Sequence, residues 1–341
     1  MKDRLTLLLV LKNRHNFTGR WLDYANIFLK DYKILIADGS PIDDKYNFNK
    51  DNFPNLKVEI PKFPYDENIG TFIKKIRDSL NIIDTEYVLY CENDDFMIAN
   101  EISNVLDFLD KNNDFISGKG EIFNFSVSSV NELYGKIIEV KQFNEYVNLG
   151  NENLIERLKL FSKNRHSLYH NIIRTEVLKD ILRNVIEKEF FDLVTFQYFW
   201  NFYIPIAGKI FCSNNLYMLH QNHRNMISKN TNLMGLNESF IYNEQISDRF
   251  YETLSLKISA KCNLNLTDSQ LILIKLFLNN QLLDLIKDNK INKNSLKTYI
   301  IKVLQKNKFT NYLLGLKQRI AYKEGSLFYK EVNMIQNFLS K

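Results

Sequence analysis

A short apolar run, Tyr87 to Cys91, ends at acidic side chains and so limits the folds open to this chain. Three carboxylates, those of Glu92, Asp94 and Asp95, fall within the next four residues. Clustered carboxylates repel one another and are costly to bury, so a buried strand rarely ends in this way without a compensating charge. A hard divalent cation such as Mg²⁺ or Mn²⁺ takes oxygen ligands and offsets both penalties. Because open α/β sheets bind ligands at the carboxyl ends of their strands, we expect an acidic metal site after this run.

The first part of the chain alternates between strand-like and helix-like segments. From the spacing of apolar residues we expect strands over 4–12, 33–37, 56–60 and 87–91, and helices over 16–29, 69–80 and 98–109. Strands that alternate with helices predict βαβ units, and therefore an α/β fold built on a mainly parallel, Rossmann-like sheet. The pattern over 115–130 is also strand-like.

A second structured block runs from 165 to 223 and contains four of the five histidines. Its patterns predict helices over 176–186 and 193–203 and strands over 208–212 and 216–220. From about residue 237 the chain has the pattern of amphipathic helices, most clearly over 269–287 and 296–320. We therefore expect an α/β domain over 1–236, followed by a helical C-terminal region over 237–341.

The composition is that of a soluble globular protein, with 45% hydrophobic and 25% charged residues. The three cysteines are far apart, which argues against a zinc knuckle or a disulfide framework and favours the reducing cytoplasm. No apolar segment approaches the roughly 18 residues of a membrane span. The N-terminal apolar run is too short for a signal sequence, so we expect neither feature.

The net charge of +5 is unevenly distributed along the chain. Residues 256–341 contain 15 Lys and Arg against 5 Asp and Glu, so the remainder of the chain is acidic. Nucleic acid, an anionic membrane surface or solubility alone could each account for a basic C-terminal region. We do not expect nucleic-acid binding, because the basic residues lie on predicted amphipathic helices without an aromatic stacking motif.

Four short motifs follow one another along the α/β half, in the order Lys12-Asn13-Arg14, Asp38-Gly39-Ser40, Asn68-Ile69-Gly70 with Arg77, and Glu92-Asn93-Asp94-Asp95. In this order they resemble the nucleotide-sugar half of inverting GT-A glycosyltransferases. More narrowly, the chain is similar to bacterial glycosyltransferases whose acidic motif ends in Asp-Asp-Phe and whose later block ends in a Leu-Tyr-Met-like strand. The resemblance is close over 4–110 and looser over 160–225, and it implies a GT-A fold with a helical C-terminal extension.

The resemblance implies a metal-dependent transferase that moves a sugar from a nucleotide-sugar donor to an acceptor hydroxyl with inversion, in bacterial surface-glycan or glycoprotein biosynthesis. Mn²⁺ or Mg²⁺ would be the cofactor. UDP is the favoured donor nucleotide, with GDP and CMP left open, and the acceptor would be a glycan, a lipid-linked glycan or a protein. A cytoplasmic location follows, with peripheral contact at the inner face of the membrane through the basic C-terminal helices.

The resemblance also assigns residues to the donor. Asp38 would contact the nucleotide base at the switch point of the sheet, and Arg14 and Arg77 would lie near the base or the diphosphate. Glu92 and Asn93 are assigned to the nucleotide-sugar as well.

Asp94, Asp95 and His220 are the implied metal ligands, with His223 as an alternative to His220. The acidic motif departs from the Asp-x-Asp of the family, because either register, Glu92-x-Asp94 or Asn93-x-Asp95, has one substituted position. Which of these carboxylates touches the metal therefore stays open.

An inverting enzyme of this kind needs a general base for the acceptor hydroxyl, which must lose its proton as the new bond forms. Asp192, just before the apolar helix, is the best match, and Glu189 is the second. A helix N-terminus would favour the ionised form of such a carboxyl. The side chains of His166, Tyr169 and His170 are candidates for the acceptor side.

Simpler structural roles compete with these assignments. The acidic segment could be a solvated turn that caps the helix beginning near Ile98, Asp192 could be a helix cap, and Asp38 could be an Asx-turn residue.

Two other functions remain open. Asn93 in place of an acidic residue would suit a catalytically inactive GT-A-like binding or scaffold module. A sugar nucleotidyltransferase is less well supported, because Lys12 to Gly19 contains one glycine and no Gly-rich loop.

Overall fold

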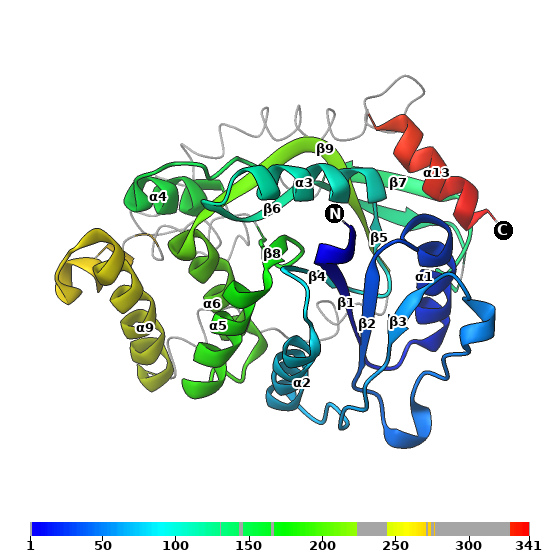
Figure 1. The fold of residues 1–341 in the computed structure, drawn as a ribbon, viewed down its shortest axis with the longest axis horizontal. Coiled ribbons are helices and arrows are strands. Elements are labelled where there is room, and N and C mark those ends of the chain that lie inside the picture. The colour runs from blue at the N-terminus through cyan, green and yellow to red at the C-terminus, as the bar shows by residue number, and fades with distance from the viewer. Residues whose placement is uncertain are drawn as a thin grey trace, which may run out of the picture.

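The computed structural model describes residues 2–129, 131–142, 146–164, 167–223, 244–270, 272–273, 276 and 328–340. Within these residues the apolar runs lie side by side in one sheet, with helices on both faces (Figure 1). Nine strands form that sheet in the described part of the chain, in the order β3-β2-β1-β4-β8-β6-β9-β5, with β7 paired to β6. Their bounds are β1 Leu5–Leu11, β2 Lys33–Asp38, β3 Lys57–Glu59, β4 Tyr87–Cys91, β5 Phe96–Met97, β6 Phe115–Val127, β7 Ile137–Gln142, β8 Ile172–Arg174 and β9 Lys209–Gln221.

The first four strands of the chain are parallel, so β1, β2 and β4 end at the same edge of the sheet. The second half of the sheet is mixed. Strands β6 and β9 run parallel over most of their length, whereas β8, β5 and β7 are antiparallel to their neighbours. The carboxyl edge of β1, β2 and β4 is the place where the fold can gather polar side chains from separate parts of the chain.

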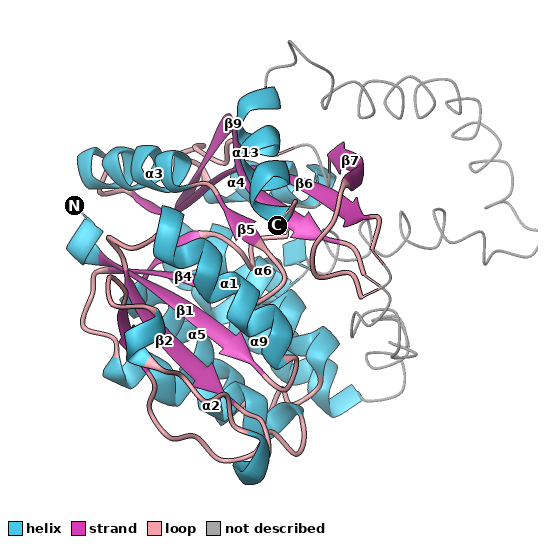
Figure 2. Cartoon of the chain, turned by 90° about the vertical axis from the view of Figure 1, so that its right-hand side faces the viewer, coloured by secondary structure: helices cyan, strands magenta, loops and turns pink. Residues whose placement is uncertain are grey.

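Two helical layers cover the sheet because both faces of its central strands are apolar. In β1, Leu7 and Leu9 belong to one hydrophobic core and Leu8 and Val10 to the other. The first core contains α1 (His15–Phe28), α3 (Ala99–Lys111) and α13 (Tyr329–Leu339), and the second contains α2 (Ile69–Ile82), α4 (Leu154–Asn164), α5 (Thr175–Glu187), α6 (Leu193–Ala207) and α9 (Glu244–Cys262). Short 3₁₀ helices cover Lys2–Arg4, Ile42–Asp44 and Lys50–Asn52. Figure 2 shows helices on both sides of the sheet.

The predicted α/β class is confirmed, and the strand expected over 115–130 is β6. The strands expected over 208–212 and 216–220 are one strand, β9. The polar residues Ser213 to Asn215 form a bulge opposite β6, where the register shifts, and do not end the strand. The helix expected over 296–320, most of the one over 269–287 and the domain boundary at residue 236 lie outside the described residues.

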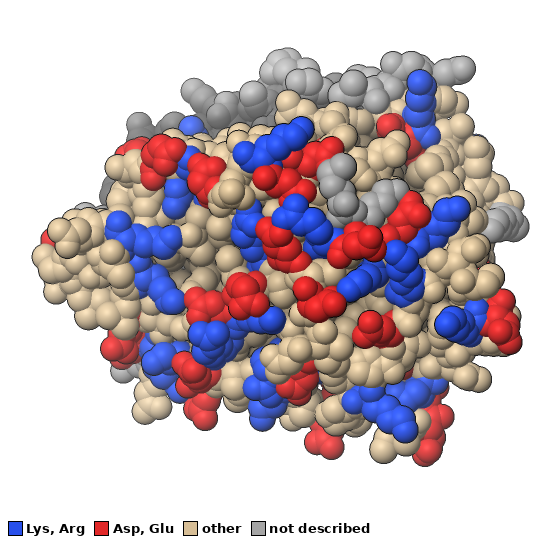
Figure 3. Space-filling view, viewed as in Figure 1, with Lys and Arg blue, Asp and Glu red and all other residues tan. Residues whose placement is uncertain are grey.

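No helix among the described residues is long and apolar enough to cross a membrane. On the face drawn in Figure 3, basic and acidic side chains alternate without a large area of one sign. Most of the basic region from residue 256 onward lies outside the described part of the chain. The expected membrane contact through that region therefore stays a prediction.

Lys119, in the middle of β6, is an ionisable side chain enclosed by the fold. Its ammonium donates a hydrogen bond to the carbonyl oxygen of Ser167 and lies 3.7 Å from the centre of the Tyr146 ring. The residue is 0% exposed, and burial lowers the pKa of Lys119 to about 7. Because the unfolded side chain has a pKa of 10.5, the unfolded chain binds more protons than the folded one between these values.

We expect Lys119→Met to raise the free energy of unfolding by about 1–4 kcal/mol at pH 6, where burying the charge is most costly. The difference in the free energy of unfolding between the variant and the wild type should shrink as the pH rises from 7 towards 10.5. In that range the buried amine is neutral, and the cost of removing its proton falls as the pH approaches the pKa of the unfolded side chain. Urea denaturation of both proteins at pH 6, 7.5 and 9 measures the difference. A difference that does not change with pH would contradict the assignment.

Candidate functional site

The acidic segment 92–95 follows β4, which lies between β1 and β8 near the middle of the sheet. Asn93, Asp94 and Asp95 are buried, and Ile98, the N-cap of α3, makes no side-chain capping bond. The segment is therefore not a solvated turn that caps the next helix. It is a polar cluster enclosed at the carboxyl edge of the sheet.

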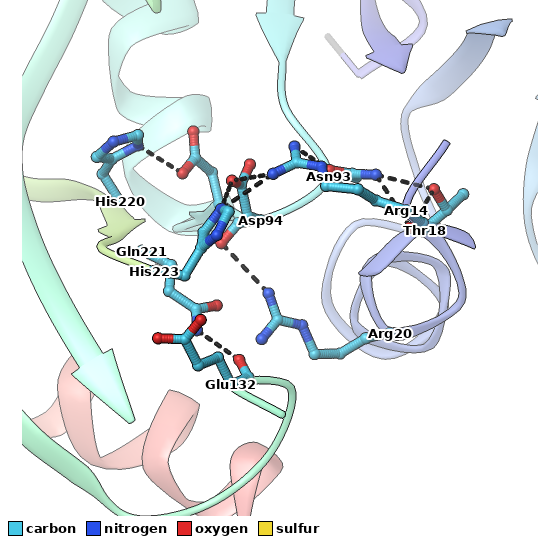
Figure 4. A network of polar contacts seen from close by, with 10 residues as sticks. Arg14, Thr18, Arg20, Asn93, Asp94, Glu132, His220, Gln221 and His223 are labelled. Carbon is cyan, nitrogen blue, oxygen red and sulfur yellow. Dashed lines mark hydrogen bonds and ion pairs between the residues drawn. The ribbon is translucent and has the colours of Figure 1, made fainter. Parts of the chain in front are cut away.

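One oxygen of Asp94 is shared by two basic side chains (Figure 4). Its Oδ2 accepts a hydrogen bond from Arg14 Nη1 at 2.9 Å and lies 2.7 Å from His223 Nε2. The main-chain oxygen of Asp94 accepts a third bond, from Arg20 Nη2 at 3.4 Å. Burial by itself would raise the pKa of Asp94, but the His223 hydrogen bond and the Arg14 charge hold it well below its usual value. Asp94 is thus ionised at physiological pH and anchored by these contacts.

Arg14 reaches this position through an unusual turn between β1 and α1. Asn13 and Arg14 both have φ of 58°, a left-handed conformation that costs energy for residues other than glycine. The turn is held by the Asn13 amide, which donates to Ser40 Oγ at 2.7 Å. Asn93 links the acidic segment to this turn and to α1. Its side-chain oxygen accepts a hydrogen bond from Arg14 Nη2 at 2.7 Å, and its side-chain amide donates one to Thr18 Oγ1 at 3.0 Å. An amide, unlike a carboxylate, can make both contacts.

Glu92, Asp95 and His220 form a separate group whose potential ligand atoms all lie within 4.8 Å of one another. His220 Nδ1 lies 2.7 Å from Asp95 Oδ1. Burial, together with the nearby charges of Asp94 and Asp95, raises the pKa of Glu92 to about 8. Burial would lower the pKa of His220, but the contact with Asp95 raises it to about 9.

The same group fits a hard divalent cation by its chemistry. Asp94 Oδ1 and Asp95 Oδ2 are buried and have no hydrogen-bond partner among the described residues. Buried carboxylate oxygens normally have partners, so these two oxygens are suited to accept a cation. Carboxylates with one imidazole are a ligand set that Mn²⁺ accepts, and Mg²⁺ prefers the carboxylates.

The carboxylate of Asp38 is used by the loop that follows β2. Oδ1 accepts from the Ser40 amide at 2.8 Å and Oδ2 from the Tyr46 amide at 2.7 Å. The ammonium of Lys45 donates to the main-chain oxygen of Asp38 at 2.7 Å. This is the Asx-turn arrangement, and it shapes the loop at the carboxyl end of β2.

A buried ion pair that the sequence analysis did not identify lies at the same edge. Lys75, on α2, donates to Asp66 Oδ2 and to the main-chain oxygen of Leu11. Burial lowers the pKa of Lys75, although Asp66 opposes the shift. Asp66 Oδ1 is buried and has no partner in the described part of the structure. Arg77, which the sequence analysis assigns to the donor, contacts Asp78 on its own helix, and its side chain is 40% exposed.

The two candidate bases have different surroundings. Asp192 is the N-cap of α6, where its Oδ1 accepts from the Thr195 amide at 2.7 Å. Its Oδ2 is buried, with no partner within the described ranges. Glu189 is 67% exposed and pairs with Arg249 at 3.2 Å. Asp192 therefore acts as a cap and retains one free oxygen.

Aromatic side chains lie behind the acidic group. Tyr169 packs against Tyr90 and Trp200, with ring centroids 4.6 Å apart in each pair, and so belongs to the core. His170 lies beside His220, with ring centroids 6.2 Å apart. Burial lowers the pKa of His170 to about 4, so its ring is neutral at physiological pH. His166 lies outside the described residues.

No protein-family profile matches this chain, and no curated protein matches it. Among solved structures, S. aureus TarS 1-349 in complex with UDP-GlcNAc is 13% identical, with a TM-score of 0.52 over 81% of this chain and 72% of that chain. A second structure of S. aureus TarS 1-349 is 15% identical, with a TM-score of 0.51 over 88% of this chain and 78% of that chain. A longer TarS structure has a TM-score of 0.46 at 15% identity, and the match covers 80% of this chain and 43% of that one. The similarity shows that this chain has a mixed α/β fold of the GT-A-like kind.

We expect Asp94→Asn to lower the free energy of unfolding by about 3 kcal/mol, because it leaves the Arg14 guanidinium without its buried carboxylate partner. Asp84→Asn is the matched control, since Asp84 forms an exposed ion pair with Lys33. The control should show a far smaller loss. Urea denaturation in the presence of EDTA measures both, and equal losses would contradict the anchoring role of Asp94.

Proposed function

We propose that this chain is a metal-dependent glycosyltransferase that transfers a sugar from a nucleotide-sugar donor to an acceptor hydroxyl with inversion. The observation that carries the proposal is the Glu92, Asp95 and His220 group at the carboxyl edge of a GT-A-like sheet. The TarS structure with UDP-GlcNAc supports a nucleotide-sugar donor and favours UDP, with GDP and CMP as alternatives. The acceptor would be a glycan, a lipid-linked glycan or a protein in a bacterial surface-glycan or glycoprotein pathway.

Glu92, Asp95 and His220 would hold Mn²⁺ or Mg²⁺. When bound, the cation would offset the negative charge of the donor diphosphate and stabilise it as the leaving group. Asp94, expected from the sequence to be a ligand, has one oxygen committed to Arg14 and His223. Its other oxygen, Oδ1, has no partner among the described residues, so Asp94 stays a candidate ligand.

Arg14 is the candidate for the diphosphate, because its side chain is 30% exposed while its guanidinium is aligned by Asp94 and Asn93. The base of the donor nucleotide would lie at the carboxyl ends of β1 and β2. There, Asp66 has an oxygen without a partner among the described residues, and Lys75 has a buried ammonium. Asp38 would shape this region through the loop that its carboxylate holds. Arg77, whose guanidinium contacts Asp78 on α2, is the second candidate for the nucleotide base or the diphosphate.

Asp192 is the proposed general base, because its free Oδ2 could accept the proton of the acceptor hydroxyl. Its other oxygen, Oδ1, is held by the Thr195 amide at the N-terminus of α6. Glu189 is the second candidate.

The alternative of an inactive binding module rested on Asn93. The link that Asn93 forms between Arg14 and Thr18 gives that residue a structural reason, so its presence does not argue for lost activity. Nucleotide binding remains the property that separates a working site from an inactive one.

We expect UDP, or else GDP or CMP, to raise the melting temperature of the wild type by a few degrees in the presence of Mn²⁺. Without Mn²⁺ the nucleotide should cause no shift. The reason is that a ligand that binds only the native state stabilises that state. Asp95→Asn should abolish the shift, whereas the exposed control Asp84→Asn should retain it. Thermal denaturation with each nucleotide, with and without Mn²⁺, makes the comparison. If no nucleotide shifts the wild type, the inactive-module alternative is favoured.

We expect Asp192→Asn to slow the release of the nucleotide from its sugar donor by about 10²–10⁴-fold, because the amide cannot accept the proton. The affinity for the free nucleotide should not change, since the variant retains an oxygen to cap α6. Donor turnover and calorimetric nucleotide binding measure the two effects separately. A large loss in Glu189→Gln with full activity in Asp192→Asn would reverse the assignment.

A further inference from the structure

Arg20, on α1, is a buried cation directly beneath the acidic segment. The residue is 1% exposed, and its guanidinium lies 4.8 Å from the centres of the Phe17 and Phe96 rings. Nη1 donates to the main-chain oxygen of Leu133 at 2.7 Å, and Nη2 donates to that of Asp94 at 3.4 Å. Arg20 thus joins the backbone of the acidic segment to the loop between β6 and β7.

The β6–β7 loop, residues 131–136, is held from a second direction. Gln221 lies at the end of β9 between the two site histidines, and its amide donates to the main-chain oxygen of Glu132 at 2.6 Å (Figure 4). Glu132 has φ of 56°, a strained conformation for a residue with a side chain. Two buried side chains from the site therefore fix this loop.

The helix α13 holds the same loop from the other side. The Gly135 amide donates to the Leu339 oxygen at 2.8 Å, and the Ile137 amide donates to Gln336 Oε1 at 2.6 Å. Phe338 packs against Phe96, the residue that follows Asp95, with ring centroids 5.8 Å apart. Helix α13 therefore contacts both the loop and the strand that continues the acidic segment.

We infer that Arg20 is a positioning residue for the acidic segment, and that α13 and the β6–β7 loop keep Arg20 and Phe96 in place. A buried guanidinium is costly, and an apolar side chain would fill the space between two phenylalanine rings at lower cost. Arg20 does what an apolar side chain cannot: it spans two main-chain carbonyls and so fixes the peptide that carries Asp94 and Asp95. Groups that orient metal ligands typically affect metal affinity by 10–100-fold.

The inference rests on the proposed function, and the test uses the full chain with Mn²⁺ and UDP as probes. Arg20→Lys keeps the positive charge, but one ammonium cannot span both carbonyls, so we expect Mn²⁺ affinity in the presence of UDP to fall by about tenfold or more. Phe338→Leu should weaken the Mn²⁺ affinity in the same direction, because the Phe338 ring packs against Phe96, next to Asp95.

Phe250→Leu is the matched control, because Phe250 is also buried and packs against Phe190 and Phe199 in the other core. It should lose a similar amount of stability in urea and keep wild-type Mn²⁺ affinity. Unchanged affinity in both Arg20→Lys and Phe338→Leu would overturn the inference, as would an equal loss in Phe250→Leu. If the wild type binds neither Mn²⁺ nor UDP, the proposed function fails, and the inference fails with it.

Discussion

The arrangement of the site depends on one buried oxygen, Oδ2 of Asp94, which Arg14 and His223 share. This contact joins the turn after β1, the segment after β4 and the end of β9, which are far apart in the sequence. Burying a carboxylate is costly, and the two close basic partners offset that cost. Because Asp94 is fixed in this way, Glu92 and Asp95 are presented together towards His220.

The α/β half of the fold could be predicted from the sequence because its strands are apolar on both faces and its helices on one. The alternation of strands and helices then places the ends of β1, β2 and β4 at one edge, as the structure confirms. The single strand β9 could not be predicted in this way. The polar residues Ser213 to Asn215 have the pattern of a break, and only the pairing with β6 makes them a bulge.

The site was less predictable, because its pairings join distant parts of the chain. The sequence identifies the acidic segment, but the partner of each carboxylate depends on where β9 places His220 and His223. The ion pair of Lys75 had no such signal. Lys75 lies outside the helical face that the apolar residues of α2 define in the sequence, so its burial and its pairing with Asp66 are seen only in the structure.

The helix α13 has a consequence for how the protein is made. Phe338, on α13, packs against Tyr24 and Phe96 in the first core. These two residues are therefore translated more than two hundred residues before the helix that they pack against. A ribosome-bound chain without α13 leaves these aromatic rings uncovered, and such transient apolar surface is what chaperones bind. Completion of this core on the ribosome is therefore delayed until α13 has emerged, whereas the core around α2, α5 and α6 can assemble earlier.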